Sequence, residues 1–297
     1  MADVFMEQLV KNQAKKKFYG NNVLISKVSV RYKDSIEREY RRVLNDYIRL
    51  VKPIFNEYLQ SIAEVYRNEV KGITVRHDDK RSLMSAIQSM LAKMSGALAE
   101  KMQAFDIQLK LSSIAEQSKK LSVKEWKNIV SRTLGVNILD DYYLGDFYRD
   151  AVSQWVSDNV DMVKSIPQDL LGEMKTIIEK SYLAGESFTK VTERLQKQYH
   201  LKRNDAKFLA RDQTAKLNSK ITRMQQETAG CSEYIWSTSG DSRVRDSHKK
   251  LNGKRFKWSE PPIVDEKTGR RAHPGEDYQC RCVAIPVFSY DNLNLPI

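Results

Sequence analysis

Residues 205–238 read DAKFLARDQTAKLNSKITRMQQETAGCSEYIWST, and the chain changes its structural character within them. The part up to Ala229 has the hydrophobic spacing of a long helix, and Gly230 is a typical residue for ending one. From Cys231 the composition changes, and residues 234–238 are typical of a short strand. This stretch therefore predicts a boundary between a helical body and a smaller unit that contains strands.

Helical spacing of apolar residues continues through most of the sequence before this boundary. A stripe over residues 36–65 predicts a long helix that begins near Asp34 and is kinked or broken at Pro53. A second stripe, over residues 83–109, predicts a helix antiparallel to the first. Further helices are expected over residues 122–135, with Ser122 as cap and Glu125 as its partner, and over residues 147–163, 169–184 and 187–195, before the long helix after His200.

The end of the chain predicts a small mixed module. Residues 282–288 are typical of a second strand, and Gly, Pro and Asp are frequent between the two strands. The fold class is therefore mainly α, with an elongated helical N-terminal body followed by a small α+β C-terminal module. We expect a basic, mobile segment at residues 1–33, a helical body at 34–200 and the C-terminal module at 201–297. The predicted core of the module is Tyr234, Trp236, Leu251, Phe256 and Trp258.

The formal net charge of +12 is concentrated at the two ends of the chain. Residues 1–33 contain 7 Lys or Arg and 2 Asp or Glu, and residues 201–297 contain 18 and 12. Basic ends suit a polyanion such as DNA, although a merely soluble basic surface is the alternative. The candidate nucleic-acid contacts are Lys11, Lys15, Lys16 and Lys17, which could equally form a solvated, mobile end.

The composition excludes several classes of protein. Three cysteines and no signal peptide argue against a secreted protein built on disulfides. No apolar run approaches the length of a membrane span, so we expect no membrane contact and a protein kept in a cytosol.

Short motifs follow one another in a specific order after residue 206. They are Ala-Arg-Asp-Gln at 210–213, Trp-x-Thr at 236–238, Asp-x-Arg-Val-Arg-x-x-His at 241–248, Leu-x-Gly at 251–253, Pro-Gly-Glu-Asp at 274–277 and Cys-Arg-Cys at 280–282. This series resembles the phage Mu F-like, or phage head morphogenesis, family of minor head proteins. The residues that carry the resemblance are Arg211, Asp212, Gln213, Trp236, Asp241, Arg243, Arg245, His248, Gly253, Pro274, Gly275, Cys280, Arg281 and Cys282.

The resemblance implies a structural minor head protein of a tailed bacteriophage. Such a protein is associated with the portal or the capsid interior and supports head morphogenesis, DNA packaging or DNA delivery. The implied partners are the portal, scaffold and major capsid proteins, with double-stranded DNA as a further candidate. The implied location is the virion, after assembly in the cytoplasm of the bacterial host. Residues before about 140 show no residue-level match to the family.

Two histidines and two cysteines of the module supply the ligand types of a tetrahedral zinc site. The candidate ligands are His248, His273, Cys280 and Cys282, and Cys231 could replace His273. The Cys-x-Cys spacing is tighter than that of standard zinc fingers, yet both thiols can reach one metal if the backbone turns between them. The alternative is a reduced, buried cysteine pair with a histidine bonded to the backbone. No other cofactor is indicated.

Charged residues surround Arg243 and Arg245 in the expected loop. Ion pairs with Asp241 and Asp246 that fix the loop are favoured over contacts of the arginines with phosphates or a portal surface. Arg211 is expected to tie the long helix to the module through Asp241.

The sequence does not indicate an enzyme. It lacks a Gly-rich phosphate loop, a His-Glu-x-x-His motif and a Gly-x-Ser-x-Gly motif. Two alternatives to the head protein are a sequence-nonspecific DNA-binding protein and a metal-dependent nuclease. The nuclease would use the carboxylates of Asp241, Asp246, Glu276 and Asp277.

Overall fold

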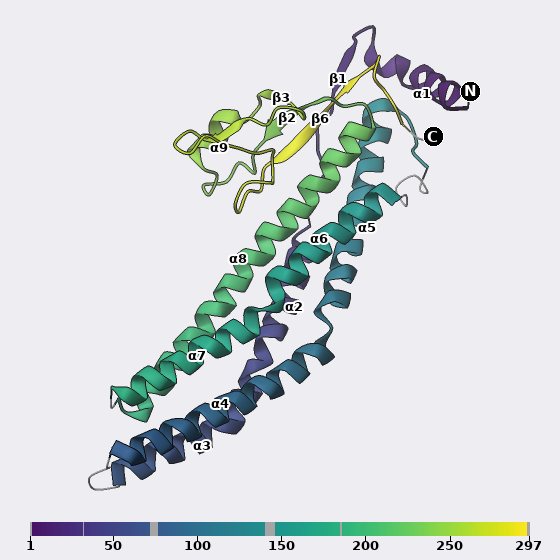
Figure 1. Cartoon of the computed structure of the whole chain (residues 1–297). Helices are drawn as coiled ribbons and strands as arrows, with labels where there is room; N and C mark the ends of the chain where they lie inside the picture. Colours follow the sequence, from purple (N-terminus) through teal and green to yellow (C-terminus); the bar gives the residue numbers. More distant parts are fainter. Residues whose placement is uncertain (1, 32, 72–76, 140–145, 185, 296–297) are drawn as a thin grey trace. The chain divides into compact units, whose positions relative to one another are not determined.

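Long helices make up most of the chain (Figure 1). The computed structural model describes all residues except 1, 32, 72–76, 140–145, 185 and 296–297. The helices of the described residues are α1 (Ala2–Phe18), α2 (Asp34–Arg49), α3 (Val51–Lys71), α4 (His77–Phe105), α5 (Ile107–Leu134), α6 (Asp146–Lys164), α7 (Ile166–Leu183), α8 (Phe188–Thr228) and α9 (Asp246–Leu251). The strands are β1 (Val23–Ile25), β2 (Glu233–Ser237), β3 (Arg255–Lys257), β4 (Ile263–Asp265), β5 (Arg270–Arg271) and β6 (Val283–Ser289).

The predicted fold class, mainly α with a small C-terminal α+β module, is confirmed. The two predicted strands correspond to β2 and β6, each displaced by one residue. Among the described residues, no helix combines the length and apolar composition that crossing a membrane needs.

Contacts within the chain divide it into two compact units. Unit 1 contains residues 1–38, 112–156 and 211–297, and unit 2 contains residues 39–111 and 157–210. Helices α2, α5, α6 and α8 each supply residues to both units. The boundaries expected after residues 33 and 200 stay a prediction.

Unit 2 is formed by helices that bury one apolar face each. The part of α2 in this unit buries Tyr40, Leu44 and Tyr47, as the predicted stripe requires. The Tyr40 hydroxyl donates to Oδ1 of Asn159 at 2.6 Å, which satisfies a buried polar pair between α2 and α6. The ring of Tyr47 lies 5.1 Å from that of Phe105, so aromatic packing joins α2 to the end of α4.

Two helix starts differ from the predicted ones. The first stripe divides at Leu50 into α2 and α3, three residues before Pro53. The proline therefore lies in the first turn of α3, where its missing N–H leaves no partner unsatisfied.

Helix α5 begins at Ile107 and runs through Ser122, which the sequence predicts as a cap. Ser122 is buried instead, and its hydroxyl donates to Oε1 of Gln225 at 3.3 Å.

Helix α8 also differs from the prediction. It is a single helix of 41 residues, whereas the apolar spacing predicts two helices with a break near His200. Residues 188–228 contain neither proline nor glycine, so no residue in this range interrupts the backbone hydrogen bonds.

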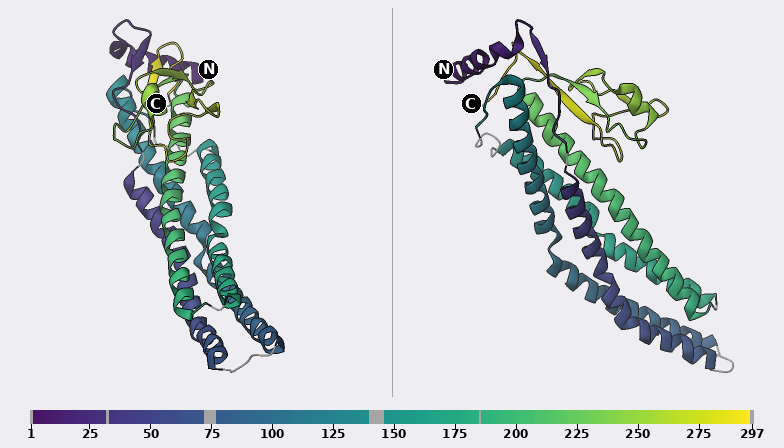
Figure 2. Two further views of the ribbon diagram at one scale, coloured as in Figure 1. Left: turned by 90° about the vertical axis from the view of Figure 1, so that its left-hand side faces the viewer. Right: turned by 180° about the vertical axis from the view of Figure 1, so that it is seen from behind.

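Unit 1 contains a four-stranded antiparallel sheet with the strand order β1-β6-β2-β3 and a separate β4-β5 pair. Strand β1 lies beside β6 (Figure 2), with Leu24 opposite Phe288. This pairing is not predicted, because a strand of three residues carries no recognisable periodicity. It places residues 23–25 of the basic N-terminal segment in the sheet, and α1 of the same segment buries Val10, Ala14 and Phe18.

Helices α5 and α8 both contact β6. The ring of Trp126 on α5 stacks on Phe288 with centroids 5.9 Å apart, and both side chains are fully buried. On α8, the side chain of Gln226 donates to the carbonyl of Ala284 at 2.8 Å. The predicted core of the module is confirmed, with Tyr234, Trp236 and Trp258 buried and Leu251 and Phe256 packed against them.

The turn after α8 depends on glycine. Gly230 has a φ of +80°, and a Cβ atom at this position would lie 1.7 Å from the carbonyl oxygen of Asn292. Residues near the C-terminus therefore pack directly against the glycine. The sequence reading of Gly230 as a helix end is confirmed, and the close approach of Asn292 adds a second reason for glycine.

We expect Gly230→Ala to destabilise unit 1 more than Gly240→Ala does. Gly240 has a similar φ of +74°, but a Cβ there would meet nothing within 4 Å. Gly240→Ala should lower the free energy of unfolding by the backbone strain alone, about 1–2 kcal/mol. Gly230→Ala should add about 1–3 kcal/mol for displacing Asn292. Chemical denaturation followed by tryptophan fluorescence measures both, and equal losses would contradict the packing described here.

Candidate metal centre

Helix α9 and the residues before β6 bring three side chains of metal-ligand type together. His248 lies on α9, and Cys280 and Cys282 lie immediately before β6. All three are buried, and their ligand atoms lie within 4.8 Å of one another. The two sulfur atoms are 3.5 and 3.6 Å from the same atom, Nδ1 of His248.

The other ring nitrogen of His248 is held by a buried carboxylate. Nε2 lies 3.0 Å from Oδ2 of Asp277, which also accepts a hydrogen bond from Arg245 at 2.9 Å. Arg270 lies 3.1 Å from the second carboxylate oxygen of Asp277. These contacts fix the orientation of the imidazole, because one ring nitrogen is bound to Asp277 and the other is left facing the two sulfurs.

The two neighbouring thiols have pKa values shifted in opposite directions. The hydrogen bond with Cys282 is the main cause that lowers the pKa of Cys280 to about 5, and His248 adds to it against the effect of burial. Cys280 and burial together raise the pKa of Cys282. Burial acts to lower the pKa of His248, but the adjacent Cys280 and Asp277 outweigh it and raise this pKa. Without a cation, the cluster therefore favours a single thiolate next to the imidazole.

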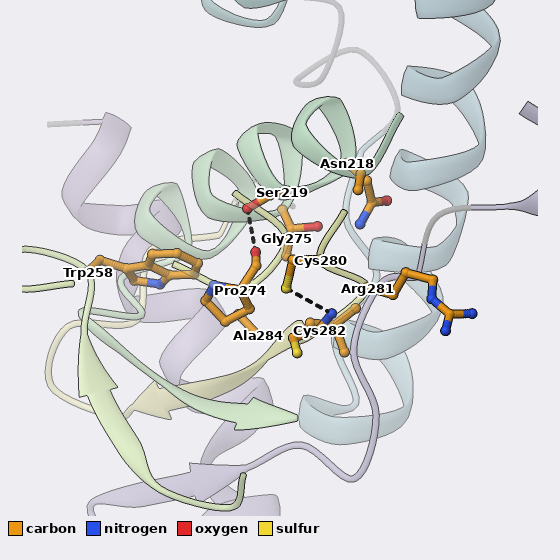
Figure 3. A pocket seen from close by; sticks show the side chains of 12 residues that line it. Asn218, Ser219, Trp258, Pro274, Gly275, Cys280, Arg281, Cys282 and Ala284 are labelled. Atoms are coloured by element: carbon orange, nitrogen blue, oxygen red, sulfur yellow. Dashed lines mark hydrogen bonds between the residues drawn. The ribbon is translucent and has the colours of Figure 1, made fainter. Parts of the chain in front are cut away.

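The segment that carries Asp277 and the cysteines lies on α8. Oδ1 of Asp212 accepts the backbone N–H of Gln279 at 2.7 Å, and the hydroxyl of Ser219 donates to the carbonyl of Pro274 at 2.6 Å (Figure 3). Gly275 has a φ of +87°, and a Cβ there would lie 3.0 Å from Cβ of Ser219. The Pro-Gly pair of the motif thus allows the segment to approach the helix closely.

A small cavity of about 10 Å³ lies between α8 and this segment. Figure 3 shows the side chains around it, with Ser219 and Asn218 on the helix and Cys280 and Cys282 on the segment. The volume has room for about one water molecule.

The loop before α9 is fixed by ion pairs, as the sequence predicts for Asp241. Its carboxylate accepts hydrogen bonds from the backbone and side chain of Arg243, at 3.0 and 3.1 Å, and from Arg281 at 2.6 Å. Asp246 is 91% exposed and pairs with Lys249 rather than with an arginine of the loop. Arg245 instead reaches Asp277, so one arginine of the motif fixes the loop and the other reaches the buried carboxylate.

The predicted bond between Arg211 and Asp241 is wrong. Arg211 lies 3.5 Å from Glu37 of α2, and its neighbour Asp212 is the residue that contacts the module. Adjacent positions on a helix point about 100° apart, so only one of them can face the module. Gln213 is buried beside Asp212, and its backbone carbonyl accepts a hydrogen bond from the indole of Trp155 at 3.1 Å.

Two of the candidate zinc ligands lie outside the cluster. Nδ1 of His273 is 2.9 Å from the hydroxyl of Tyr234, and its ring packs on Trp258 at 4.9 Å. Burial is the main cause that lowers the pKa of His273. Cys231 is buried directly after α8, where burial raises the pKa of its thiol. In the described part of the chain, the group with metal-ligand geometry is His248, Cys280 and Cys282.

The remaining candidate residues lie in separate contacts. The four carboxylates of the nuclease hypothesis do not form one group among the described residues, since Glu276 accepts the backbone N–H of His273 while Asp241, Asp246 and Asp277 have the partners given above. Gly253, with a φ of +75°, donates its backbone N–H to the backbone carbonyl of Trp236 at 2.8 Å.

The candidate nucleic-acid contacts lie on α1. The side chain of Lys11 donates to the backbone carbonyl of Asp291 at 2.8 Å, and the last turn of α1 exposes Lys15, Lys16 and Lys17.

Asp277 is the residue whose role the sequence does not predict. Its position next to Glu276 suggests a carboxylate pair, but the structure turns only Asp277 towards His248. The signal available in the sequence is its place three residues before Cys280, which keeps it near the cysteines.

Comparison with known proteins supports the resemblance of the module to a known family. Residues 173–285 match the family model described as phage Mu protein F like protein. This region is similar to that family. The resemblance of the motifs between residues 206 and 288 is therefore confirmed, and the match includes α8, β2, β3, the first residues of β6 and the three clustered side chains.

One relative comes from Haemophilus influenzae strain Rd and is described as an uncharacterized protein. It is 32% identical over 138 residues, which cover 46% of this chain and 30% of the relative. The chain thus matches less than a third of that protein's length. No solved structure matches the chain.

We expect Asp277→Asn to lower the free energy of unfolding of unit 1 by about 1–3 kcal/mol, because it leaves His248 and Arg245 without a buried charged acceptor. Asp246→Asn is the control, since this exposed residue pairs only at the surface and should change the value by less than about 0.5 kcal/mol. Chemical denaturation of both variants with a chelator present measures this loss of stability without any contribution from a bound metal ion. A loss for Asp277→Asn no larger than for Asp246→Asn would count against the network.

The order of the Asp241 loop should depend on pH below 4. The hydrogen bond from Arg243 is the main cause that lowers the pKa of Asp241 to about 2, from an unfolded value of about 3.9. A lowered pKa contributes stability that is present above the unfolded value and is lost as pH falls through about 2. Hydrogen exchange of residues 238–246, corrected for intrinsic rates, should show this loss between about pH 4 and 2. In Arg243→Gln the loss should begin at higher pH, and an unshifted profile would reject the assignment.

Proposed function

We propose that the chain is a structural minor head protein of a tailed bacteriophage. The observation that carries this proposal is the match of residues 173–285 to the phage Mu F-like family. The ordered motifs of the same region, from Arg211 to Cys282, support it. The resemblance implies incorporation into the phage head, near the portal or in the capsid interior, with a role in morphogenesis, DNA packaging or DNA delivery.

The contacts of the motif residues favour a structural role over a catalytic one. Asp212, Asp241 and Asp277 each bind another part of the module. The cavity beside the cysteines has a volume of about 10 Å³. Small-molecule sites usually occupy about 300–1,000 Å³. The proposed role is therefore an assembly role carried out through protein surfaces.

The proposed partners are the portal, scaffold and major capsid proteins. Contact with double-stranded DNA is a secondary proposal that rests on the net charge of +12 and on the exposed Lys15, Lys16 and Lys17. These lysines lie in the last turn of α1, where cations also interact favourably with the helix dipole. Their exposure alone thus does not require DNA.

The test is deletion of the gene from a phage or prophage that encodes the chain. Deletion should abolish or strongly reduce DNA-filled heads, and the chain should be detected by mass spectrometry in purified wild-type particles. Complementation with the wild-type gene should restore filled heads. Normal yields of infectious particles after deletion, together with absence of the chain from purified particles, would overturn the proposal.

Two further measurements separate the alternative functions. A DNA-binding protein acting through phosphates loses affinity steeply as salt rises, so strong binding to DNA without association with heads would favour that alternative. Metal-dependent DNA cleavage by the purified chain, lost in Asp241→Ala, would favour a nuclease. A head protein shows neither result.

A further inference from the structure

We propose that His248, Cys280 and Cys282 bind one zinc ion. The coordinating atoms are Nδ1 of His248 and the two sulfur atoms. The three side chains come from two parts of the module, α9 and the start of β6, which are about thirty residues apart in the chain. A shared metal ion would join these parts, and such a link stabilises a small, loop-rich unit most.

The distances fit tetrahedral zinc. A Zn–S bond of about 2.3 Å and a Zn–N bond of about 2.0–2.1 Å at the tetrahedral angle place sulfur and nitrogen about 3.6 Å apart. The observed separations of Nδ1 from the two sulfurs are 3.5 and 3.6 Å. All three ligand atoms lie within 4.8 Å of one another, so a small rotation of the side chains would bring them to the spacing that one ion needs.

Hydrogen bonding alone satisfies this cluster poorly. Nδ1 carries either one proton or one lone pair, whereas two sulfur atoms approach it at nearly equal distances. A metal ion accepts electron pairs from all three atoms at once. A Zn²⁺ ion with two thiolates is also electrically neutral, which lowers the cost of burying the group. Binding releases a proton from each thiol that was protonated.

Asp277 would act as a positioning residue for the metal. Its contact with Nε2 leaves Nδ1 as the nitrogen that faces the sulfurs. Metal-bound histidines usually donate their other N–H to a carboxylate or carbonyl in this way. Arg245 and Arg270 both contact the carboxylate of Asp277. These two arginines compensate the negative charge of Asp277, so the carboxylate is paired even without a metal ion.

The fourth coordination position would be taken by solvent. His273 and Cys231, the other candidates from the sequence, lie in separate buried contacts. Cys280 and Cys282, but not His248, line the nearby cavity, which has room for about one water molecule. Two thiolates and an imidazole in tetrahedral geometry select zinc over magnesium or calcium, which prefer oxygen ligands.

The test is the zinc content of the full-length chain, purified under reducing conditions without a metal-binding tag and measured by mass spectrometry of the elements. We expect about one zinc ion per chain. Cys280→Ser and Cys282→Ser should each lower zinc content or affinity at least about tenfold, and Asp277→Asn should weaken affinity by about 10–100-fold. Cys231→Ser and His273→Gln are matched controls that replace buried residues of the same types, and both should retain zinc.

A second measurement covers variants that fail to fold. The wild-type chain, stripped by a chelator and reloaded with Co²⁺, should show sulfur-to-cobalt charge-transfer absorption and strong visible bands of a tetrahedral site. Less than about one zinc ion per ten chains, together with no such cobalt spectrum, would overturn the proposal. Loss of zinc in His273→Gln or Cys231→Ser, with retention in Cys280→Ser, would overturn the assigned ligands. A chain without zinc could still be a head protein, so this result is independent of the proposed function.

Discussion

The hydrogen bond from the backbone N–H of Gln279 to Asp212 joins the module to the helix on which it depends. It holds the segment before β6 against α8, and the bond from Ser219 to Pro274 holds the same segment about two turns further along the helix. Gly275 lies between these two contacts and allows the backbone to approach. The positions of Asp277, Cys280 and Cys282 follow from this attachment, because each lies within five residues of a fixed point.

This arrangement gives the motif residues a common physical purpose. Asp241 fixes the loop before α9, Asp277 orients His248, and Asp212 fixes the segment that carries Asp277. Each is a carboxylate that accepts backbone or charged donors, and such bonds are stronger than neutral ones. Asp241 and Asp277, which the nuclease alternative would use, thus bind other parts of the module. A metal bound to the three clustered side chains would complete the same set of constraints.

Much of the fold can be predicted from the sequence. The change at Gly230, the strands β2 and β6 and the aromatic core around Trp236 follow from composition and periodicity. Other features depend on contacts between distant residues. Strand β1 pairs with β6, and Ser122 lies within α5 with its hydroxyl bonded to Gln225. The ligand types at the candidate metal centre were recognisable, but the sequence did not exclude His273, since its pairing with Tyr234 depends on the folded sheet.

Asp212, and not its neighbour Arg211, attaches the module to α8. Hydrogen exchange of residues 272–282 and of α9 in Asp212→Ala and Arg211→Ala tests it directly. We expect Asp212→Ala to remove protection from both segments together, whereas Arg211→Ala should leave them protected, because Arg211 faces Glu37. Unchanged protection in Asp212→Ala, or an equal loss in Arg211→Ala, would contradict it.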